Sequence, residues 1–234
     1  MDVAIVGGTG KEGFGLALRL LSAGHAVTIG SRSADRAADA VARAEDALGP
    51  DVAVRGSDNA GSVAGASVVV VTVPFAGVIE IYESIAPALQ RGQVVLDATS
   101  PLMSAVGGKP WEAIRPWHGS AAELAAAHVP AGVSVVAGFH TIAAHSLAAL
   151  DREVESDALL CADDDDAKRL VGGLIESVPG MRWVDAGPLA NARLTEPLTP
   201  LIITINRRYE LRDGGFRITG RDSWGAPDRP STGR

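Results

Sequence analysis

Three glycines near the start of the chain have the spacing of a phosphate-binding loop. Gly8, Gly10 and Gly13 form the pattern G-x-G-x-x-G between a strand-like apolar run and a helix-like segment. The alternative, an ordinary glycine-rich turn, would not require these two flanking elements. In such a loop the first glycine allows a tight turn, the second lets the backbone approach a pyrophosphate, and the third lets the helix pack close to the strand. The free N–H groups at the helix N-terminus then donate to the phosphates. The predicted dinucleotide-binding residues are Gly8, Thr9, Gly10, Lys11, Glu12 and Gly13.

The residues after the second strand-like run indicate which dinucleotide this loop would bind. Proteins that bind NAD place an aspartate or glutamate here, which binds the ribose hydroxyls. This chain instead has Ser31 and Arg32, and Arg36 follows one helical turn later. A guanidinium group can grip a 2′-phosphate, whereas a carboxylate would repel it. We therefore predict NADP(H) rather than NAD(H); the alternative role for Arg32 is that of a solvated surface residue.

Prolines and small polar residues follow three further strand-like runs. Ligands of open α/β sheets bind at the carboxyl ends of the strands, so we expect these residues to line a crevice. His140 is the strongest candidate for a polar group beside reacting rings, and the alternative is a structural hydrogen-bonding role. The residues of this predicted crevice are Val73, Pro74, Thr99, Ser100, Pro101, His140, Thr141 and Ile142.

Short apolar runs alternate with longer amphipathic segments along the chain. We predict strands over residues 2–6, 26–29, 52–54, 67–72, 94–96, 134–137, 158–161 and 182–184. We predict helices over residues 12–23, 34–48, 78–88, 120–127, 164–177 and 189–206. The strand-like runs are continuously apolar, as in strands buried on both faces of a parallel sheet. This pattern predicts an α/β fold, namely a Rossmann-like doubly wound parallel sheet with a small C-terminal α/β portion.

The same alternation suggests how the chain is divided. We predict a dinucleotide-binding Rossmann domain over residues 1–150, a small C-terminal portion over 151–211 and a flexible tail over 212–234. Apolar residues within 194–205 fit either a core helix or a dimer interface. Residues 100–119 have no periodicity, and a loop of this length in a compact domain is usually functional or mobile.

The composition argues against several other classes of protein. The chain has 234 residues, with 21 Lys and Arg against 28 Asp and Glu and a net charge of −7, so we expect no nucleic-acid partner. Its one cysteine, Cys161, excludes an intrachain disulfide and a cysteine-rich zinc site, and favours the cytoplasm. The start of the chain does not resemble a signal peptide, and the apolar runs are shorter than the about 18 residues of a membrane span. The histidines show no ligand spacing, so no metal is expected.

Taken in order, the motifs resemble the NADPH-dependent coenzyme F420 reductases, also called F420H2:NADP+ oxidoreductases. The resemblance covers residues 2–206, and its last three motifs are the most specific because the glycine loop alone is typical of any Rossmann domain. The motifs are GGTGKEG (7–13), GSR (30–32), TVP (72–74), GSAAE (119–123), FHT (139–141), DAGPL (185–189), NARL (191–194) and EPLTPL (196–201).

The resemblance implies hydride transfer between NADP(H) and the deazaflavin coenzyme F420 in a homodimer whose C-terminal portion contributes to the F420 side. By position, the implied contacts to the NADP phosphates are Thr9, Ser31, Arg32 and Arg36, and those beside the stacked rings are His140, Thr141 and Ile142. The implied contacts on the F420 side are Pro101, Leu102, Met103, Arg193 and Thr199. Residues 100–119 depart from the family's pattern, and a structural salt bridge is the alternative role for Arg193.

Hydride transfer between two ring carbons needs neither a nucleophile nor a metal from the protein. This requirement agrees with a sequence that has no H-E-x-x-H motif, no G-x-S-x-G motif and no pair of carboxylates at catalytic spacing. Two other functions remain open at this point. One is an NADPH-dependent reductase of another acceptor, such as an imine, and the other is a non-enzymatic NADP(H)-binding redox sensor.

Overall fold

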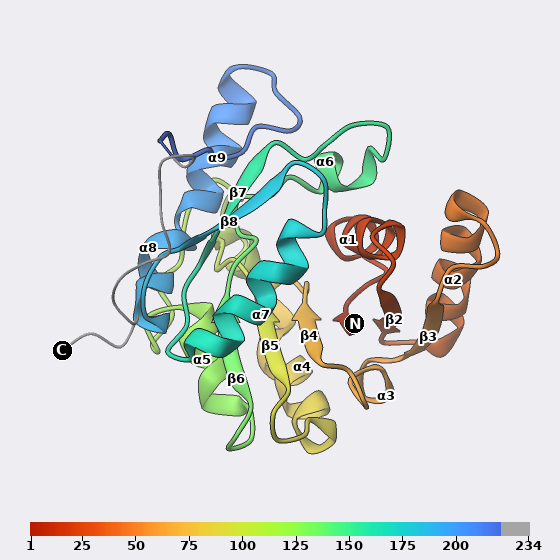
Figure 1. The fold of residues 1–234 in the computed structure, drawn as a ribbon. Coiled ribbons are helices and arrows are strands. Elements are labelled where there is room, and N and C mark those ends of the chain that lie inside the picture. Colours follow the sequence, from red (N-terminus) through yellow and green to blue (C-terminus); the bar gives the residue numbers. More distant parts are fainter. Residues whose placement is uncertain (221–234) are drawn as a thin grey trace.

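Six short strands form one parallel sheet in the structure, a computed structural model that describes residues 1–220 (Figure 1). The strand order is β3-β2-β1-β4-β5-β6, which is the order of a dinucleotide-binding Rossmann fold. All of the pairings within this sheet are parallel. The strands are β1 (Asp2–Val6), β2 (Ala26–Ser31), β3 (Val54–Asp58), β4 (Val68–Val71), β5 (Val94–Asp97) and β6 (Ser134–Ala137).

Helices cover both faces of the sheet, which explains why its central strands are continuously apolar. Val3 and Ile5 of β1 face a core formed with α1 (Lys11–Ser22), α2 (Ala34–Leu48) and α7 (Asp165–Glu176). Ala4 and Val6 face the opposite core, formed with α4 (Val78–Ile85) and α5 (Ala121–His128). Burying one such valine or isoleucine side chain stabilises the fold by about 1.5–3 kcal/mol.

The C-terminal portion contributes a second, smaller sheet. β7 (Ser156–Leu160) and β8 (Met181–Asp185) pair in parallel, and Cys161 forms an antiparallel bridge to Ala137 at the end of β6. The core on the α1 side continues without interruption into residues of β7 and α7. The predicted fold class is therefore confirmed, while the boundary at residue 150 remains a prediction.

Most differences between predicted and observed elements occur where burial is one-sided or a proline intervenes. The expected strand at 52–54 is instead β3, and three of its five residues are exposed because it lies at the edge of the sheet. The expected helix at 189–206 is divided into a short 3-10 turn, α8 (Ala192–Thr195) and α9 (Leu198–Arg208), with Pro197 at the start of α9. Two short helices, α3 (Asn59–Ser62) and α6 (Ala144–Ala148), were not predicted.

The long loop and the tail contact the body of the molecule at specific residues. In the loop at 100–119, Leu102 bridges to Ala113, and the Trp111 ring lies 4.1 Å from the Arg207 guanidinium of α9. The N–H of Asp157 in β7 donates to the carbonyl of Phe216 at 2.8 Å. The flexible tail predicted over 212–234 lies partly outside the described residues, which end at 220. Among residues 1–220, no helix is long and apolar enough to cross a membrane.

Candidate functional site

A cavity of about 470 Å³ opens at the carboxyl ends of β1, β2 and β4, where the sequence predicted a dinucleotide. We call it the glycine-loop cavity. Seven of the predicted cofactor-binding residues line it, namely Thr9, Gly10, Ser31, Arg32, Arg36, Val73 and Pro74. Its remaining lining residues are Gly7, Asn59, Thr72, Ala76, Gly77, Glu80 and Ile81.

The glycine loop has the backbone geometry that its spacing predicted. The N–H of Gly8 donates to the carbonyls of Ile5 at 3.1 Å and Gly30 at 2.9 Å, which closes a tight turn onto the end of β2. A Cβ atom at Gly13 would lie 2.5 Å from the Thr72 hydroxyl and 2.9 Å from the Gly8 backbone. Only glycine therefore allows α1 to start this close to β1 and β4.

The N-terminus of α1 is free to bind an anion. Its N-cap is Gly10, and no side chain among residues 1–220 caps the first turn. The N–H groups of that turn thus remain available, and the helix dipole favours negative charge there. Lys11 is exposed in this turn, while burial raises the pKa of Glu12 to about 8. Neither of these two side chains lines the glycine-loop cavity, so their predicted role in binding remains a prediction.

The end of β2 presents two guanidinium groups to the cavity, and no carboxylate occupies the strand end itself. Ser31 is buried, whereas Arg32 and Arg36 are exposed and reach the cavity. The nearest acid on the neighbouring strand is Asp58, which pairs with Ser31 in the register of the sheet. Its carboxylate accepts from the N–H of Gly61 at 2.6 Å and so caps α3. This arrangement fits a ribose that carries a 2′-phosphate.

A second group of predicted residues meets at the ends of β5 and β6, and we call Ser100, His140 and Thr199 the His140 cluster. The Thr199 hydroxyl donates to the His140 carbonyl oxygen at 2.6 Å and lies 2.8 Å from the Ser100 hydroxyl. Since Thr199 has one proton to donate, Ser100 must donate to Thr199. Residues far apart in the chain are thus joined by two hydrogen bonds. The cluster does not line the glycine-loop cavity, but β4 and β5 adjoin, so both lie on one edge of the sheet.

The imidazole of His140 is buried and has free hydrogen-bonding capacity. The residue is 7% exposed, and neither ring nitrogen makes a well-aligned hydrogen bond to a described residue, although the Ala98 backbone lies near enough to offset part of the shift in the His140 pKa. Burial lowers the pKa of His140 to about 4, so the ring is neutral at physiological pH. The preceding residue, Phe139, has φ of 68°, a left-handed conformation that is rare and strained for a bulky side chain. A ring that keeps an unused nitrogen beside a strained backbone is a strong candidate for ligand contact.

A buried carboxylate, which no motif indicates, holds the turn that carries Ser100. Asp97, at the end of β5, accepts from the Tyr82 hydroxyl at 2.5 Å, from the Thr99 N–H at 3.0 Å and from the Thr99 hydroxyl at 3.3 Å. Burial raises the pKa of Asp97 to about 6, although these three hydrogen bonds favour its ionised form. The predicted residue Thr99 is itself buried and acts here as a partner of Asp97.

Two further carboxylates tie α8 and α9 to α5. Glu196 is buried and accepts from the backbone N–H groups of Ala121 at 2.9 Å and Ala122 at 3.0 Å. Arg193 donates to both carboxylate oxygens of Glu123, at 2.7 Å and 2.5 Å. The structure thus shows for Arg193 the salt bridge that was the alternative to an F420 contact. Glu196 was part of the EPLTPL motif, but its role as a helix cap could not be read from the sequence.

The remaining predicted residues lie beside these two groups. Thr141 and Ile142 are buried directly after His140. Pro101 and Met103 form the base of the long loop, where the Ile114 N–H donates to the Pro101 carbonyl at 2.8 Å and the Met103 N–H donates to the Glu112 carbonyl at 2.8 Å. The turn that begins at Met103 packs against residues 75–77, next to the cavity wall. Within residues 1–220, no group of His, Cys, Asp and Glu could hold a metal ion.

Comparisons with known proteins agree with this geometry. Residues 2–101 match the family model described as NADP oxidoreductase, coenzyme F420-dependent. The chain is 40% identical over 221 residues to the F420-dependent NADP reductase of Methanothermobacter thermautotrophicus, covering 94% of this chain and 95% of that protein. It is 34% identical over 222 residues to the protein of the same name from Methanocaldococcus jannaschii, covering 94% of this chain and 98% of that protein.

A solved structure from Arthrobacter sp. FB24, assigned to F420-dependent NADP reductase, superimposes with a TM-score of 0.79. The two chains are 26% identical, and the match covers 94% of this chain and 99% of the other. The likeness therefore extends over both the six-stranded sheet and the C-terminal portion.

Proposed function

Since this chain belongs to the family of coenzyme F420-dependent NADP oxidoreductases, we propose that it transfers a hydride between NADP(H) and F420. The observation that carries the proposal is the glycine-loop cavity, which joins the uncapped N-terminus of α1 to two arginines at the end of β2. That arrangement has the donors that a pyrophosphate and a 2′-phosphate require. The two coenzymes, when bound, supply the carbon that gives the hydride and the carbon that accepts it.

The protein contributes binding, orientation and exclusion of water. We propose that the first-turn N–H groups of α1 hold the pyrophosphate, with Thr9 beside them, and that Arg32 and Arg36 hold the 2′-phosphate. Val73 and Pro74 form the apolar wall that leads from the cavity towards β5. Holding two rings at reacting distance provides most of the rate enhancement that such a reaction needs.

We propose that His140, Thr141 and Ile142 face the rings at the end of β6. A neutral imidazole offers one N–H donor and one acceptor, so His140 can orient a polar ring edge without placing a positive charge beside it. The hydrogen bonds of Thr199 to the His140 backbone and to Ser100 hold the segments after β5 and β6 together. Pro101, Leu102 and Met103 are proposed as F420-side contacts because the loop that carries them packs against residues 75–77 at the cavity wall.

The activity is tested with the two coenzymes alone. Purified protein mixed with NADPH and oxidised F420 should bleach the deazaflavin absorbance, and F420H2 with NADP+ should restore it. An NADPH-binding protein that leaves F420 unchanged at every pH would overturn the proposal. An imine offered in place of F420 serves as the control acceptor, and faster turnover of the imine would favour a different reductase.

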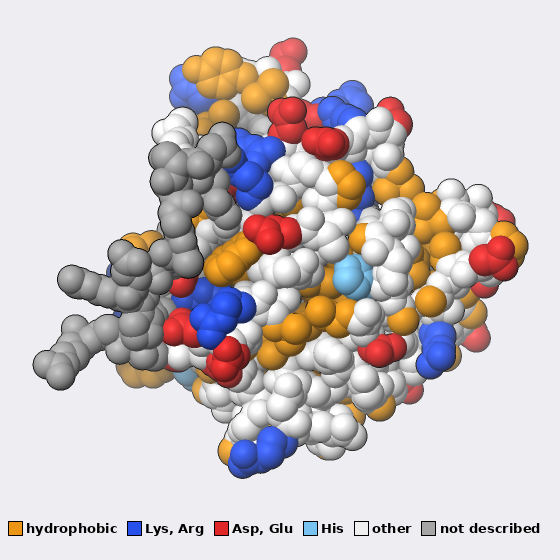
Figure 2. All heavy atoms as spheres, viewed as in Figure 1, with side chains coloured by type: hydrophobic (Ala, Val, Ile, Leu, Met, Phe, Trp, Pro, Cys, Tyr) orange, Lys and Arg blue, Asp and Glu red, His pale blue; other side chains and the backbone are white. Residues whose placement is uncertain are grey.

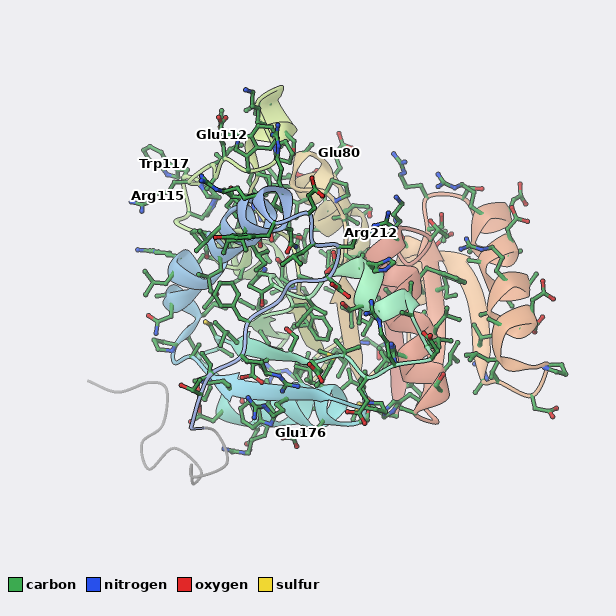
Figure 3. The ribbon with its side chains drawn as sticks, turned by 90° about the horizontal axis from the view of Figure 1, so that it is seen from above. Glu80, Glu112, Arg115, Trp117, Glu176 and Arg212 are labelled. Atoms are coloured by element: carbon green, nitrogen blue, oxygen red, sulfur yellow. The ribbon has the colours of Figure 1, made fainter. Side chains whose placement is uncertain are left out.

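We propose a homodimer formed through α8, α9 and the loop at 100–119. Leu194 is 70% exposed and Leu201 is 48% exposed, and Figure 3 shows Trp117 and Arg115 at the outer edge of the molecule. Exposed apolar side chains of this size support an interface between copies. Light scattering should give twice the chain mass of 24.0 kDa, and Leu201→Glu should shift it towards the monomer. A monomeric wild-type protein would contradict the proposal.

We further propose a cytoplasmic location and no nucleic-acid partner. The single cysteine, Cys161, is buried and unpaired, which suits a reducing compartment. On the face shown in Figure 2, Lys and Arg side chains are scattered among Asp and Glu and form no continuous basic surface. The net charge of −7 supports the same expectation.

A further inference from the structure

Asn59 occupies a position in the glycine-loop cavity that the sequence motifs did not indicate. It follows Asp58, the last residue of β3, and Asp58 pairs with Ser31 at the end of β2. Asn59 is 6% exposed, and the little surface it retains lines the cavity together with Ser31 and Arg32. A polar side chain is therefore buried beside the place where a 2′-phosphate would bind.

The orientation of the Asn59 amide follows from its partner. The backbone N–H of Gly7 lies 3.3 Å from Oδ1 of Asn59. A backbone N–H can only donate, so the atom facing it must be the carbonyl oxygen rather than the amide nitrogen. This assignment leaves Nδ2 with two protons to donate, and no residue of the described part of the chain accepts from it. The free donor belongs to a side chain that borders the cavity.

The surroundings hold Asn59 in this position. A Cβ atom at Gly30 would lie 3.1 Å from Oδ1 of Asn59 and 2.5 Å from the Ser62 hydroxyl, so glycine is needed for α3 to approach β2. The Ser62 hydroxyl donates to the Asn59 carbonyl oxygen at 2.8 Å. The Asp58 carboxylate accepts from Gly61 within α3.

We propose that Asn59 is a specificity-determining residue with two functions, which rests on the proposed binding of NADP(H). Its Oδ1 holds the Gly7 turn of the glycine loop, and its Nδ2 donates to the 2′-phosphate beside Ser31 and Arg32. Asn59 thus links the part of the site that binds the pyrophosphate to the part that distinguishes NADP(H) from NAD(H). An aspartate here would keep the first function and reverse the second, because its carboxylate still accepts from Gly7 but cannot donate to a phosphate.

Two substitutions separate these functions, and binding is measured without F420. Dissociation constants for NADPH and NADH are obtained by isothermal titration calorimetry for the wild type, Asn59→Asp, Asn59→Ala and the control Thr204→Val. A hydrogen bond to a charged group changes affinity by about 10- to 100-fold. We expect Asn59→Asp to lose at least that factor for NADPH and much less for NADH, so that the NADPH preference falls. Asn59→Ala should weaken both nucleotides, and Thr204→Val, which removes a hydrogen bond within α9 away from the cavity, should weaken neither.

The outcomes distinguish this inference from the proposed reaction. An unchanged ratio of NADPH to NADH affinity in a folded Asn59→Asp protein would overturn the role of Nδ2. Equal affinities for wild type and Asn59→Ala would overturn both functions. Thermal unfolding of each variant shows whether it is folded. A wild-type protein that binds NADPH but does not reduce F420 would refute the proposed reaction and leave the inference standing.

Discussion

The glycine-loop cavity and the His140 cluster lie on the same edge of one sheet, yet the chain builds them differently. The glycine loop that borders the cavity is formed by consecutive residues. The two arginines of the cavity follow the next strand of the chain, β2. The His140 cluster instead joins three separate segments, namely those that follow β5 and β6 and the first turn of α9. Local backbone geometry therefore governs the first region, whereas long-range hydrogen bonds govern the second.

The two regions also differ in solvation. Arg32 and Arg36 are exposed, so they can move to meet a phosphate and are screened by solvent and salt. His140 and Asp97 are buried, and their environment shifts the pKa of each by desolvation. Substitutions in the cavity should accordingly change affinity for one nucleotide, while substitutions in the cluster should change stability, its pH dependence and turnover.

The largest effect is expected for Arg32→Asp. The substitution removes a charge-assisted contact and places a carboxylate near the 2′-phosphate, so the NADPH dissociation constant should rise by about 100- to 1,000-fold. NADH carries no 2′-phosphate, so its dissociation constant should change little. Titration calorimetry measures both, and Arg55→Asp, an exposed charge reversal on β3, is the control. Equal losses for the two nucleotides would contradict the assignment of the 2′-phosphate.

The next effect concerns stability against pH. The pKa of His140 is lowered from 6.5 to about 4 in the folded protein, so the unfolded chain binds more protons between these values. The contribution of His140 to stability should therefore fall by about 3 kcal/mol as the pH drops from 6.5 to 4, opposite in sign to that of Asp97, whose pKa is raised to about 6. Urea unfolding of the wild type and of His140→Gln across that range tests this contribution, because the difference in unfolding free energy between the two proteins should change by that amount. A variant profile parallel to that of the wild type would show that His140 is not buried in its neutral form.

A smaller loss is expected for Gly13→Ala. Its new methyl group would collide with the Thr72 hydroxyl and the Gly8 backbone, which should cost about 1–3 kcal/mol of unfolding free energy and weaken NADPH binding. The matched control is Gly173→Ala in α7, where nothing lies within 4 Å of the new atom. That variant should gain about 0.5–1 kcal/mol because alanine favours a helix interior. Equal stability of the two variants would contradict the close packing of α1 against the sheet at Gly13.

The smallest effect should come from Thr199→Val. It removes the hydrogen bonds to the His140 carbonyl and to Ser100, at a cost of about 1–2 kcal/mol. Because the cluster does not line the cavity, turnover with F420 should slow while the NADPH dissociation constant stays the same. Thr204→Val, which removes a hydrogen bond to Pro200 within α9, is the control. A parallel loss of NADPH affinity would mean that the two regions are not independent.

The sequence alone determined the features that depend on short stretches of chain. The glycine spacing predicted the loop because one turn and one helix start lie within seven residues, and the structure confirms the turn. Continuous apolar runs predicted the parallel sheet because its central strands are buried on both faces. The Ser-Arg pair at the end of β2 predicted a cationic end of the cavity, and both residues line it.

Only the tertiary structure decided which distant groups meet. Asp97 finds Tyr82, Glu196 caps α5, Arg193 pairs with Glu123, and Asn59 accepts from Gly7 across 52 positions of the chain. These partners have no fixed spacing, because the packing of separate elements brings them together rather than the period of a helix or strand. Burial then sets the pKa of His140, and burial is a property of the folded molecule that no single position in the sequence carries.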